Sequence, residues 1–251
     1  MTLYMIGIGL HDQKDISMNG LEVVKKCDSI YLEIYTSKLN CSKSDLEALY
    51  GKKIIIADRE MVEKHADETI LNHSEQGECA FLVIGDVFSA TTHTDLFIRA
   101  RKKGVKVRII HNASVLTAVG ITGLELYKFG KTTSIPFENK DVKSPIDVFS
   151  QNQKNNMHTL FLLDLDPKND KYMTVSEAAI FIMEKGVSGE MLAVGCAGLG
   201  SQDPEIKAGK ISEFASQDNK SKIEFSKLPQ CLIIPAKDLH FIEEEAVNMW
   251  K

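Results

Sequence analysis

The chain has 251 residues, 43% of them hydrophobic and 26% charged, so it can bury one large core or two smaller ones. Its formal net charge of -5 argues against a broad nucleic-acid-binding surface, because such surfaces carry an excess of Lys and Arg. The apolar run at residues 3–10 is too short to span a bilayer, so we expect a cytoplasmic protein without a signal peptide or membrane segment.

The cysteines and histidines do not form a recognisable metal motif. The five cysteines lie far apart and include no CxxC pair, and the seven histidines do not pair at metal-binding spacing. The motifs GxxxxGK[ST], HExxH and GxSxG are also absent. We therefore predict no metal site and expect the cysteines to be reduced.

Short apolar runs alternate with helical patterns in the first half of the chain. The apolar runs cover residues 3–10, 29–35, 52–58, 79–85 and 105–111. The helical patterns cover residues 17–27, 42–51, 59–75 and 92–104, and Gly104 is a typical helix stop. Continuous apolar runs are typical of strands covered on both faces. The alternation therefore predicts βαβ units and a parallel sheet.

The pattern changes in the middle of the chain. Residues 113–130 form a short helical passage interrupted by two glycines, and residues 132–137 predict another strand. Residues 138–156 are polar, contain Pro145 and have weak helical potential at residues 146–152. This is typical of a boundary or an exposed connection. We therefore expect two domains, at residues 1–135 and 136–251.

The second half has fewer apolar runs. We expect strands at residues 157–165, 190–200 and 228–236, and helices at residues 174–186 and 237–250. Thr174 or Ser176 could cap the first helix, and Gly186 could end it. This pattern predicts a smaller α/β domain with a mixed sheet.

The first strand ends in the sequence GIGLHD at residues 7–12, which resembles a dinucleotide-binding turn. That fingerprint requires a third glycine so that a helix N-terminus can point at a pyrophosphate, and Asp12 stands at that position. The E/D-x-G-x-G pattern of ordinary methyltransferases is absent as well. The remaining interpretation is a glycine turn that lets another group approach the backbone closely.

Three other strand ends carry small polar residues: GDVFSATTH at 85–93, HNASVLTAVG at 111–120 and FLLDLD at 161–166. Ligands of open α/β sheets collect at the carboxyl ends of strands. Taken singly, Asp86 can cap a turn, Ser114 can cap a helix and Asp164 can close a strand. Together with GIGL they offer a carboxylate and hydroxyls without a basic group. This combination suits a cationic sulfonium with an amino-acid tail better than NAD or ATP.

In order, the segments YMIGIGL, YLEIYTS, GDVFSATTHTDL, IIHNASV, GLELYKFG and MHTLFLLDLD resemble the diphthine synthases. These belong to the tetrapyrrole methylase superfamily, or class III methyltransferases, and the resemblance covers essentially the whole chain. It implies two α/β domains, a homodimer, and S-adenosylmethionine bound in the cleft between the domains.

The resemblance also implies a set of cofactor-binding residues. These are Leu10, Asp86, Ser89, Ser114, Val115, Leu163, Leu199 and Gln230. Gln230 stands where eukaryotic members often carry His, and because an amide does not titrate near neutral pH, this puts a proton-transfer role there in doubt. We expect Asp86→Ala to weaken cofactor binding much more than folding.

The implied reaction is successive methyl transfer from S-adenosylmethionine to the amine of 3-amino-3-carboxypropyl-histidine in translation elongation factor 2. The products are diphthine and S-adenosylhomocysteine, and eukaryotic members are also described as methylating the carboxylate. The sequence identifies no general base and does not fix the number of methyl groups. A corrin-precursor methylase and a non-catalytic ligand-binding module remain as alternatives. We expect neither a nucleic-acid nor a membrane partner.

Overall fold

The computed structural model describes residues 1–216, 218 and 222–251. The chain forms two compact units, Met1–Leu116 and Thr117–Lys251. This division differs from the boundary expected after residue 135, because strand β6 (Thr133–Ile135) pairs with β7 (Thr159–Leu163) in the second sheet. The polar stretch expected to be a connection contains helix α7, Ser144–Lys154, with Pro145 in its first turn.

The first unit contains a five-stranded sheet in the order β3-β2-β4-β1-β5. Its strands are β1 (Thr2–Gly7), β2 (Ser29–Glu33), β3 (Ile55–Ala57), β4 (Glu78–Val83) and β5 (Lys106–Ile110). Every neighbouring pair in this sheet runs parallel, which confirms the prediction from the βαβ pattern. The carboxyl ends of the strands therefore share one edge.

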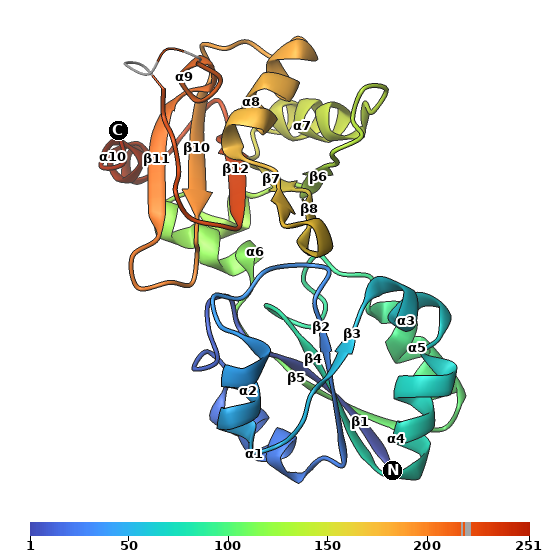
Figure 1. Ribbon diagram of the computed structural model, residues 1–251. Coiled ribbons are helices and arrows are strands. Elements are labelled where there is room, and N and C mark those ends of the chain that lie inside the picture. The colour runs from blue at the N-terminus through green and yellow to red at the C-terminus, as the bar shows by residue number, and fades with distance from the viewer. Residues whose placement is uncertain (217, 219–221) are drawn as a thin grey trace. The chain divides into compact units, whose positions relative to one another are not determined.

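Helices cover both faces of this sheet. They are α1 (Met18–Lys26), α2 (Lys43–Tyr50), α3 (Arg59–Lys64), α4 (Asn72–Gln76) and α5 (Thr94–Lys102). Figure 1 shows α1 and α2 on one face and α3, α4 and α5 on the other. Two buried clusters result, one with Leu3 and Phe81 and the other with Ile6 and Ile30. The helix predicted at residues 59–75 is divided by a π-helical turn, Asp67–Leu71.

Local sequence signals begin and end several helices. The Ser17 side chain accepts a hydrogen bond from the Gly20 N–H and caps α1, and Ser42 and Asp45 form a capping box on α2. Gly104, which follows α5, has a φ of 76°. That left-handed conformation favours glycine, so the predicted helix stop is confirmed.

The second unit contains a five-stranded sheet in the order β11-β10-β12-β7-β6. The strands not yet named are β10 (Leu192–Ala197), β11 (Glu205–Lys210) and β12 (Gln230–Ile234). The β6–β7 pair is parallel and the other neighbouring pairs are antiparallel, so the sheet is mixed, as predicted. Strand β11 was not predicted from the sequence, because it is an edge strand and its sequence EIKAGK has little apolar character. The short pair β8 (Leu165–Asp166) and β9 (Lys171–Tyr172) was not predicted either.

The helices of the second unit pack around this sheet. After α6 (Val115–Ala118), where the units divide, and α7 come α8 (Val175–Glu184), α9 (Ile211–Phe214) and α10 (Phe241–Asn248). Helices α7, α8 and α9 contribute to one buried cluster with the sheet. Thr174 caps α8 in a capping box with Glu177, as the sequence allows. Within the described part of the chain, no helix has the length and apolar character needed to cross a membrane.

A buried ionic network holds α10 to the segment GLELYKFG. The Glu243 carboxylate accepts hydrogen bonds from His158 Nε2 at 2.7 Å, Lys128 Nζ at 2.7 Å and the Glu125 and His240 backbone N–H groups. Burial alone would raise the pKa of Glu243, but these donors outweigh it and lower the pKa to about 2. The Ala236 N–H donates to His158 Nδ1, so this histidine is neutral and carries its proton on Nε2.

Candidate functional site

The glycines at the carboxyl edge of the first sheet allow two chain segments to meet. The Gly85 N–H donates to Gly9 O at 2.7 Å, and the Gly9 N–H donates to Gly85 O at 3.3 Å. Gly9 and Gly85 have φ values of 82° and 86°, in the left-handed region that favours glycine. A Cβ on Gly7 would lie only 2.6 Å from Gly85 O. The group that approaches the GIG backbone is therefore the segment after β4.

Asp15 and Asn112 hold this edge together. Asp15 Oδ2 accepts hydrogen bonds from the Leu10 N–H at 3.1 Å and the His11 N–H at 2.6 Å. Asn112 Nδ2 donates to the backbone oxygens of Gly7 and Asp15, each at 3.0 Å. Neither residue is among the site residues predicted from the sequence. Asn112 belongs to the segment IIHNASV, which carries part of the family resemblance.

Asp86 is the hydrogen-bonding centre of this edge. Its Oδ1 accepts from the Phe88 N–H at 3.2 Å and from Ser89 Oγ at 3.3 Å. Its Oδ2 accepts from His111 Nδ1 at 2.9 Å and from the Asn112 N–H at 3.1 Å. Burial alone would raise the pKa of Asp86, which is 8% exposed, but these donors outweigh burial and lower the pKa. The carboxylate is therefore ionised, and each of its oxygens already accepts two hydrogen bonds.

This geometry confirms that Asp86 caps a turn, as the sequence allows, and adds a link to a second segment that the sequence does not predict. The carboxylate joins the segment after β4 to the segment after β5, and two of its four donors are backbone N–H groups. Removing the side chain leaves both N–H groups without their acceptor. Asp86→Ala should therefore lower the stability of the folded protein, in contrast to the expectation from the sequence.

The ATTH segment, residues 90–93, shapes the loop before α5. Ala90 has a φ of 60°, and Thr91 Oγ1 donates to Val87 O at 2.7 Å. His93 is buried, with Nδ1 3.3 Å from Val87 O and Nε2 3.3 Å from the Tyr35 hydroxyl. Because a carbonyl only accepts, Nδ1 carries the proton and the Tyr35 hydroxyl donates to Nε2. Burial lowers the pKa of His93 to about 4, so the histidine is neutral in the folded protein.

Glu33 is a second buried carboxylate near this edge, at the end of β2. It accepts hydrogen bonds from the Tyr35 N–H, the Thr36 N–H and the Thr36 hydroxyl. Burial raises the pKa of Glu33, although these donors oppose the shift. The YLEIYTS segment therefore forms a local turn, in which residues 35 and 36 donate hydrogen bonds to the Glu33 carboxylate.

The first unit contains five of the residues predicted to bind the cofactor. Leu10, Ser89 and Val115 are half-buried, and Asp86 and Ser114 are buried. Asp86 and Ser89 are in direct contact, and both Leu10 and Ser114 lie on segments that this edge holds together. The structure therefore gathers these residues at the carboxyl ends of β1, β4 and β5.

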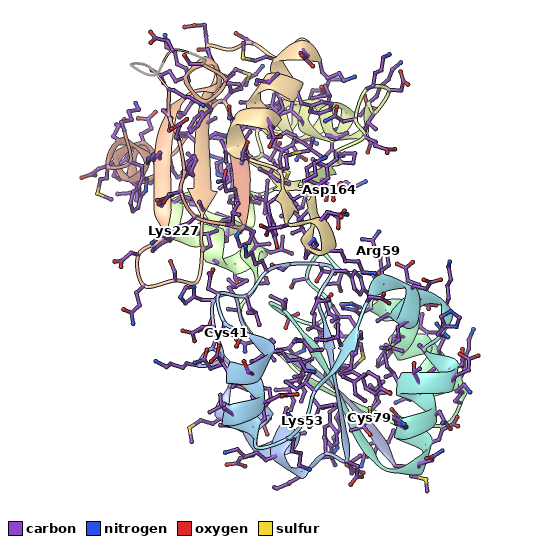
Figure 2. All side chains as sticks on the ribbon, viewed as in Figure 1. Cys41, Lys53, Arg59, Cys79, Asp164 and Lys227 are labelled. Atoms are coloured by element: carbon purple, nitrogen blue, oxygen red, sulfur yellow. The ribbon has the colours of Figure 1, made fainter. Side chains whose placement is uncertain are left out.

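The other three predicted residues, Leu163, Leu199 and Gln230, lie together at the ends of neighbouring inner strands of the second sheet. Gln230 begins β12 and pairs with Ala197 at the end of β10, two residues before Leu199. On its other side β12 pairs with β7, with Cys231 opposite Leu162, which puts Gln230 beside Leu163. Asp164, labelled in Figure 2, uses its carboxylate to accept from the Phe137 and Leu165 N–H groups, so it closes the strand end.

The Gln230 amide is already engaged in the fold. Its Oε1 accepts from the Val175 N–H at the start of α8 at 2.8 Å, and its Nε2 donates to Lys227 O at 3.0 Å. An amide has a second lone pair and a second N–H, so it can hold this structure and still contact a ligand. No proton-transfer role is needed to explain a glutamine here.

The described residues contain no group of three or more His, Cys, Asp or Glu side chains that could hold a metal ion. The first edge instead combines an ionised carboxylate, glycine backbone and serine hydroxyls, and no Lys or Arg is among the donors to Asp86. This donor set fits a cationic sulfonium cofactor better than a polyphosphate.

Comparison with known proteins identifies the class. The family model described as Tetrapyrrole (Corrin/Porphyrin) Methylases matches residues 2–215. The chain therefore belongs to the tetrapyrrole methylase family and is a methyltransferase.

Individual relatives narrow the assignment. The chain is 41% identical to the diphthine methyl ester synthase of Homo sapiens, over 99% of this chain and 94% of that protein. It is also 41% identical to the diphthine synthase of Methanocella arvoryzae, over 98% of this chain and 96% of that protein. A crystal structure of diphthine synthase matches with a TM-score of 0.91 at 36% identity, covering 100% of this chain and 96% of the other. Within the family, the chain groups with the diphthine synthases.

Proposed function

We propose that this chain transfers methyl groups from S-adenosylmethionine to the amine of 3-amino-3-carboxypropyl-histidine in translation elongation factor 2. The product is diphthine. The observation that supports this most strongly is the 41% identity, over nearly the full length of both chains, to proteins named diphthine methyl ester synthase and diphthine synthase. Relatives of equal similarity carry the names diphthine synthase and diphthine methyl ester synthase. Methylation of the carboxylate is therefore decided by the experiment below.

The proposed cofactor contacts are Leu10, Asp86, Ser89, Ser114, Val115, Leu163, Leu199 and Gln230. In the first unit, we assign the direct contacts to Leu10, Ser89, Ser114 and Val115. Asp86 contributes its negative charge near the sulfonium and orders the loop that carries Ser89, because its hydrogen-bonding positions are already occupied. The bound cofactor supplies an activated methyl group, so the protein mainly has to align the amine with it.

The test is methyl transfer from labelled S-adenosylmethionine to purified elongation factor 2 carrying the unmethylated intermediate. Label in the factor supports the proposal, and the mass of the modified peptide counts three methyl groups or four. Label only in a corrin precursor would replace it with a tetrapyrrole methylase activity, which the family description also covers. Cofactor binding without transfer to either acceptor would indicate a non-catalytic module.

A matched pair of variants tests the cofactor residues. Ser89→Ala removes a half-buried hydroxyl beside Asp86, whereas Ser44→Ala removes one at the exposed start of α2. Calorimetry should show weaker binding of S-adenosylmethionine for Ser89→Ala only, by about two- to tenfold, as expected for one hydrogen bond. Equal affinities for both variants would remove Ser89 from the set.

We also propose a homodimer, as the family resemblance implies, and a cytoplasmic location, because the proposed substrate is a translation factor. Sedimentation of the purified chain tests the first. Fluorescence microscopy of the tagged chain tests the second.

A further inference from the structure

His111 and Asp86 form a pair with the geometry of a catalytic dyad. His111 Nδ1 lies 2.9 Å from Asp86 Oδ2, while 70% of the histidine side chain is exposed. An ionised carboxylate only accepts hydrogen bonds, so it fixes the proton of neutral His111 on Nδ1. The Nε2 lone pair is then held in a defined direction at the edge where Ser89 and Ser114 lie.

We propose that His111 is the general base of the amine methylation and that Asp86 is its positioning residue. The proposal rests on the proposed function. An ammonium group has no lone pair, so it must lose a proton before it can accept a methyl group. The substrate ammonium gives that proton to His111 Nε2, and the amine lone pair then forms the N–CH₃ bond. The CH₃–S bond breaks, its electron pair stays on sulfur, and S-adenosylhomocysteine leaves as a neutral thioether.

Three methyl transfers release three protons, so the base must be regenerated each time. The exposed imidazolium can pass its proton to water between transfers, which a fully buried histidine such as His93 cannot do. Methylation of the carboxylate is different, because that group carries no proton at neutral pH. His111 is therefore required for transfer to nitrogen and dispensable for transfer to oxygen.

Other charged groups at this edge must be considered. Asp12, Asp15 and His11 lie on the segment after β1, and Asp86 lies on the segment after β4. Arg108 lies on β5 itself, three residues before His111. Asp15 Oδ2 is taken by two backbone N–H groups, and the Asp12 carboxylate accepts the Lys14 N–H. His11 Nδ1 is bonded to the Asn40 amide instead of a carboxylate, which makes His11 the alternative base to be tested.

The first experiment needs only the protein. Nitrogen NMR of imidazole rings distinguishes the Nδ1–H tautomer from the Nε2–H tautomer. We expect neutral His111 to be the Nδ1–H tautomer in the wild type and to lose this preference in Asp86→Asn. An Nε2–H tautomer in the wild-type protein would overturn the dyad. Because no cofactor or substrate is present, this result is independent of the proposed function.

The second experiment uses His111→Asn, whose amide can replace Nδ1 as donor to Asp86 but provides no base. At about pH 6.5, only about 3% of an amine with a pKa near 8 is neutral, so N-methylation should fall about 30-fold. At about pH 9 most of the amine is already neutral, so the defect should shrink to within about threefold. Affinity for S-adenosylhomocysteine should stay within about twofold of the wild type.

Two further measurements test whether the defect is confined to N-methylation and to His111. Where the wild type adds a methyl group to the carboxylate, His111→Asn should retain that rate. His65→Asn, at an exposed helix end in the same unit, serves as control. A pH-independent defect in His111→Asn, or loss of N-methylation in His11→Asn alone, would overturn the assignment of the base. Absence of any transfer by the wild type would instead refute the proposed function.

Discussion

Asp86→Ala is the substitution for which sequence and structure make different predictions. The sequence predicts a cofactor defect with little effect on folding, whereas the structure shows four donors on this carboxylate. Ser89 and His111 are partly exposed and can bond to water instead. The backbone N–H groups of Phe88 and Asn112 are partly buried, and losing their acceptor costs about 1–2 kcal/mol each. We therefore expect the free energy of unfolding to fall by about 2–4 kcal/mol.

Urea unfolding followed by far-UV circular dichroism measures this change. Trp250, the only tryptophan in the sequence, lies in the second unit and donates its indole N–H to Thr122 O, so its fluorescence reports on that unit separately. The matched control is Asp95→Ala, because Asp95 is 67% exposed and pairs with Arg99 one helical turn away. That variant should stay within about 0.5 kcal/mol of the wild type.

A free energy of unfolding of Asp86→Ala within about 0.5 kcal/mol of the wild type would refute the structural role of this carboxylate. If such a variant also lost its affinity for S-adenosylmethionine, the carboxylate would contact the cofactor directly and would not support the loop. A destabilised variant that binds normally once folded would assign Asp86 to the loop alone.

Three further predictions concern stability. The pKa of His93 is about 4 in the folded protein and about 6.5 in the unfolded chain. Protonation of His93 should therefore not reduce the free energy of unfolding above pH 6.5, but should lower it by up to about 3 kcal/mol as the pH falls toward 4. His93→Gln should flatten this pH dependence, whereas His65→Gln should retain it. Ala90→Gly should stabilise the first unit by about 0.5–1 kcal/mol in urea titrations, because Ala90 has a positive φ. Glu243→Gln should destabilise the second unit by about 3–5 kcal/mol at neutral pH, and Glu245→Gln by less than about 0.5 kcal/mol, measured by Trp250 fluorescence. Because the pKa of Glu243 is lowered to about 2, its contribution is complete above about pH 4.5 and is lost as the pH falls through 2.

The periodicity of the first half was sufficient to predict its parallel sheet. Continuous apolar runs are typical of strands covered on both faces, and helical stretches between consecutive strands are typical of parallel crossover connections. The second half was harder, because β11 is an edge strand with few apolar residues and α7 lies in a polar stretch. The structure divides the chain after Leu116, whereas the sequence placed the boundary after residue 135. Strand β6 belongs to the second unit because it pairs with β7, which follows it in the chain.

The sequence by itself determined the class of protein, the edge of the first sheet as a candidate site, and the small, polar residues at that edge. It could not determine what each of these residues does, because roles depend on contacts between segments far apart in the chain. Gly7 is a glycine because Gly85 O lies against it, and the histidine of ATTH packs into the interior instead of facing a substrate. Only the tertiary structure brought Asp86 beside His111, 25 positions later, and this contact is the basis for proposing that Asp86 positions a base.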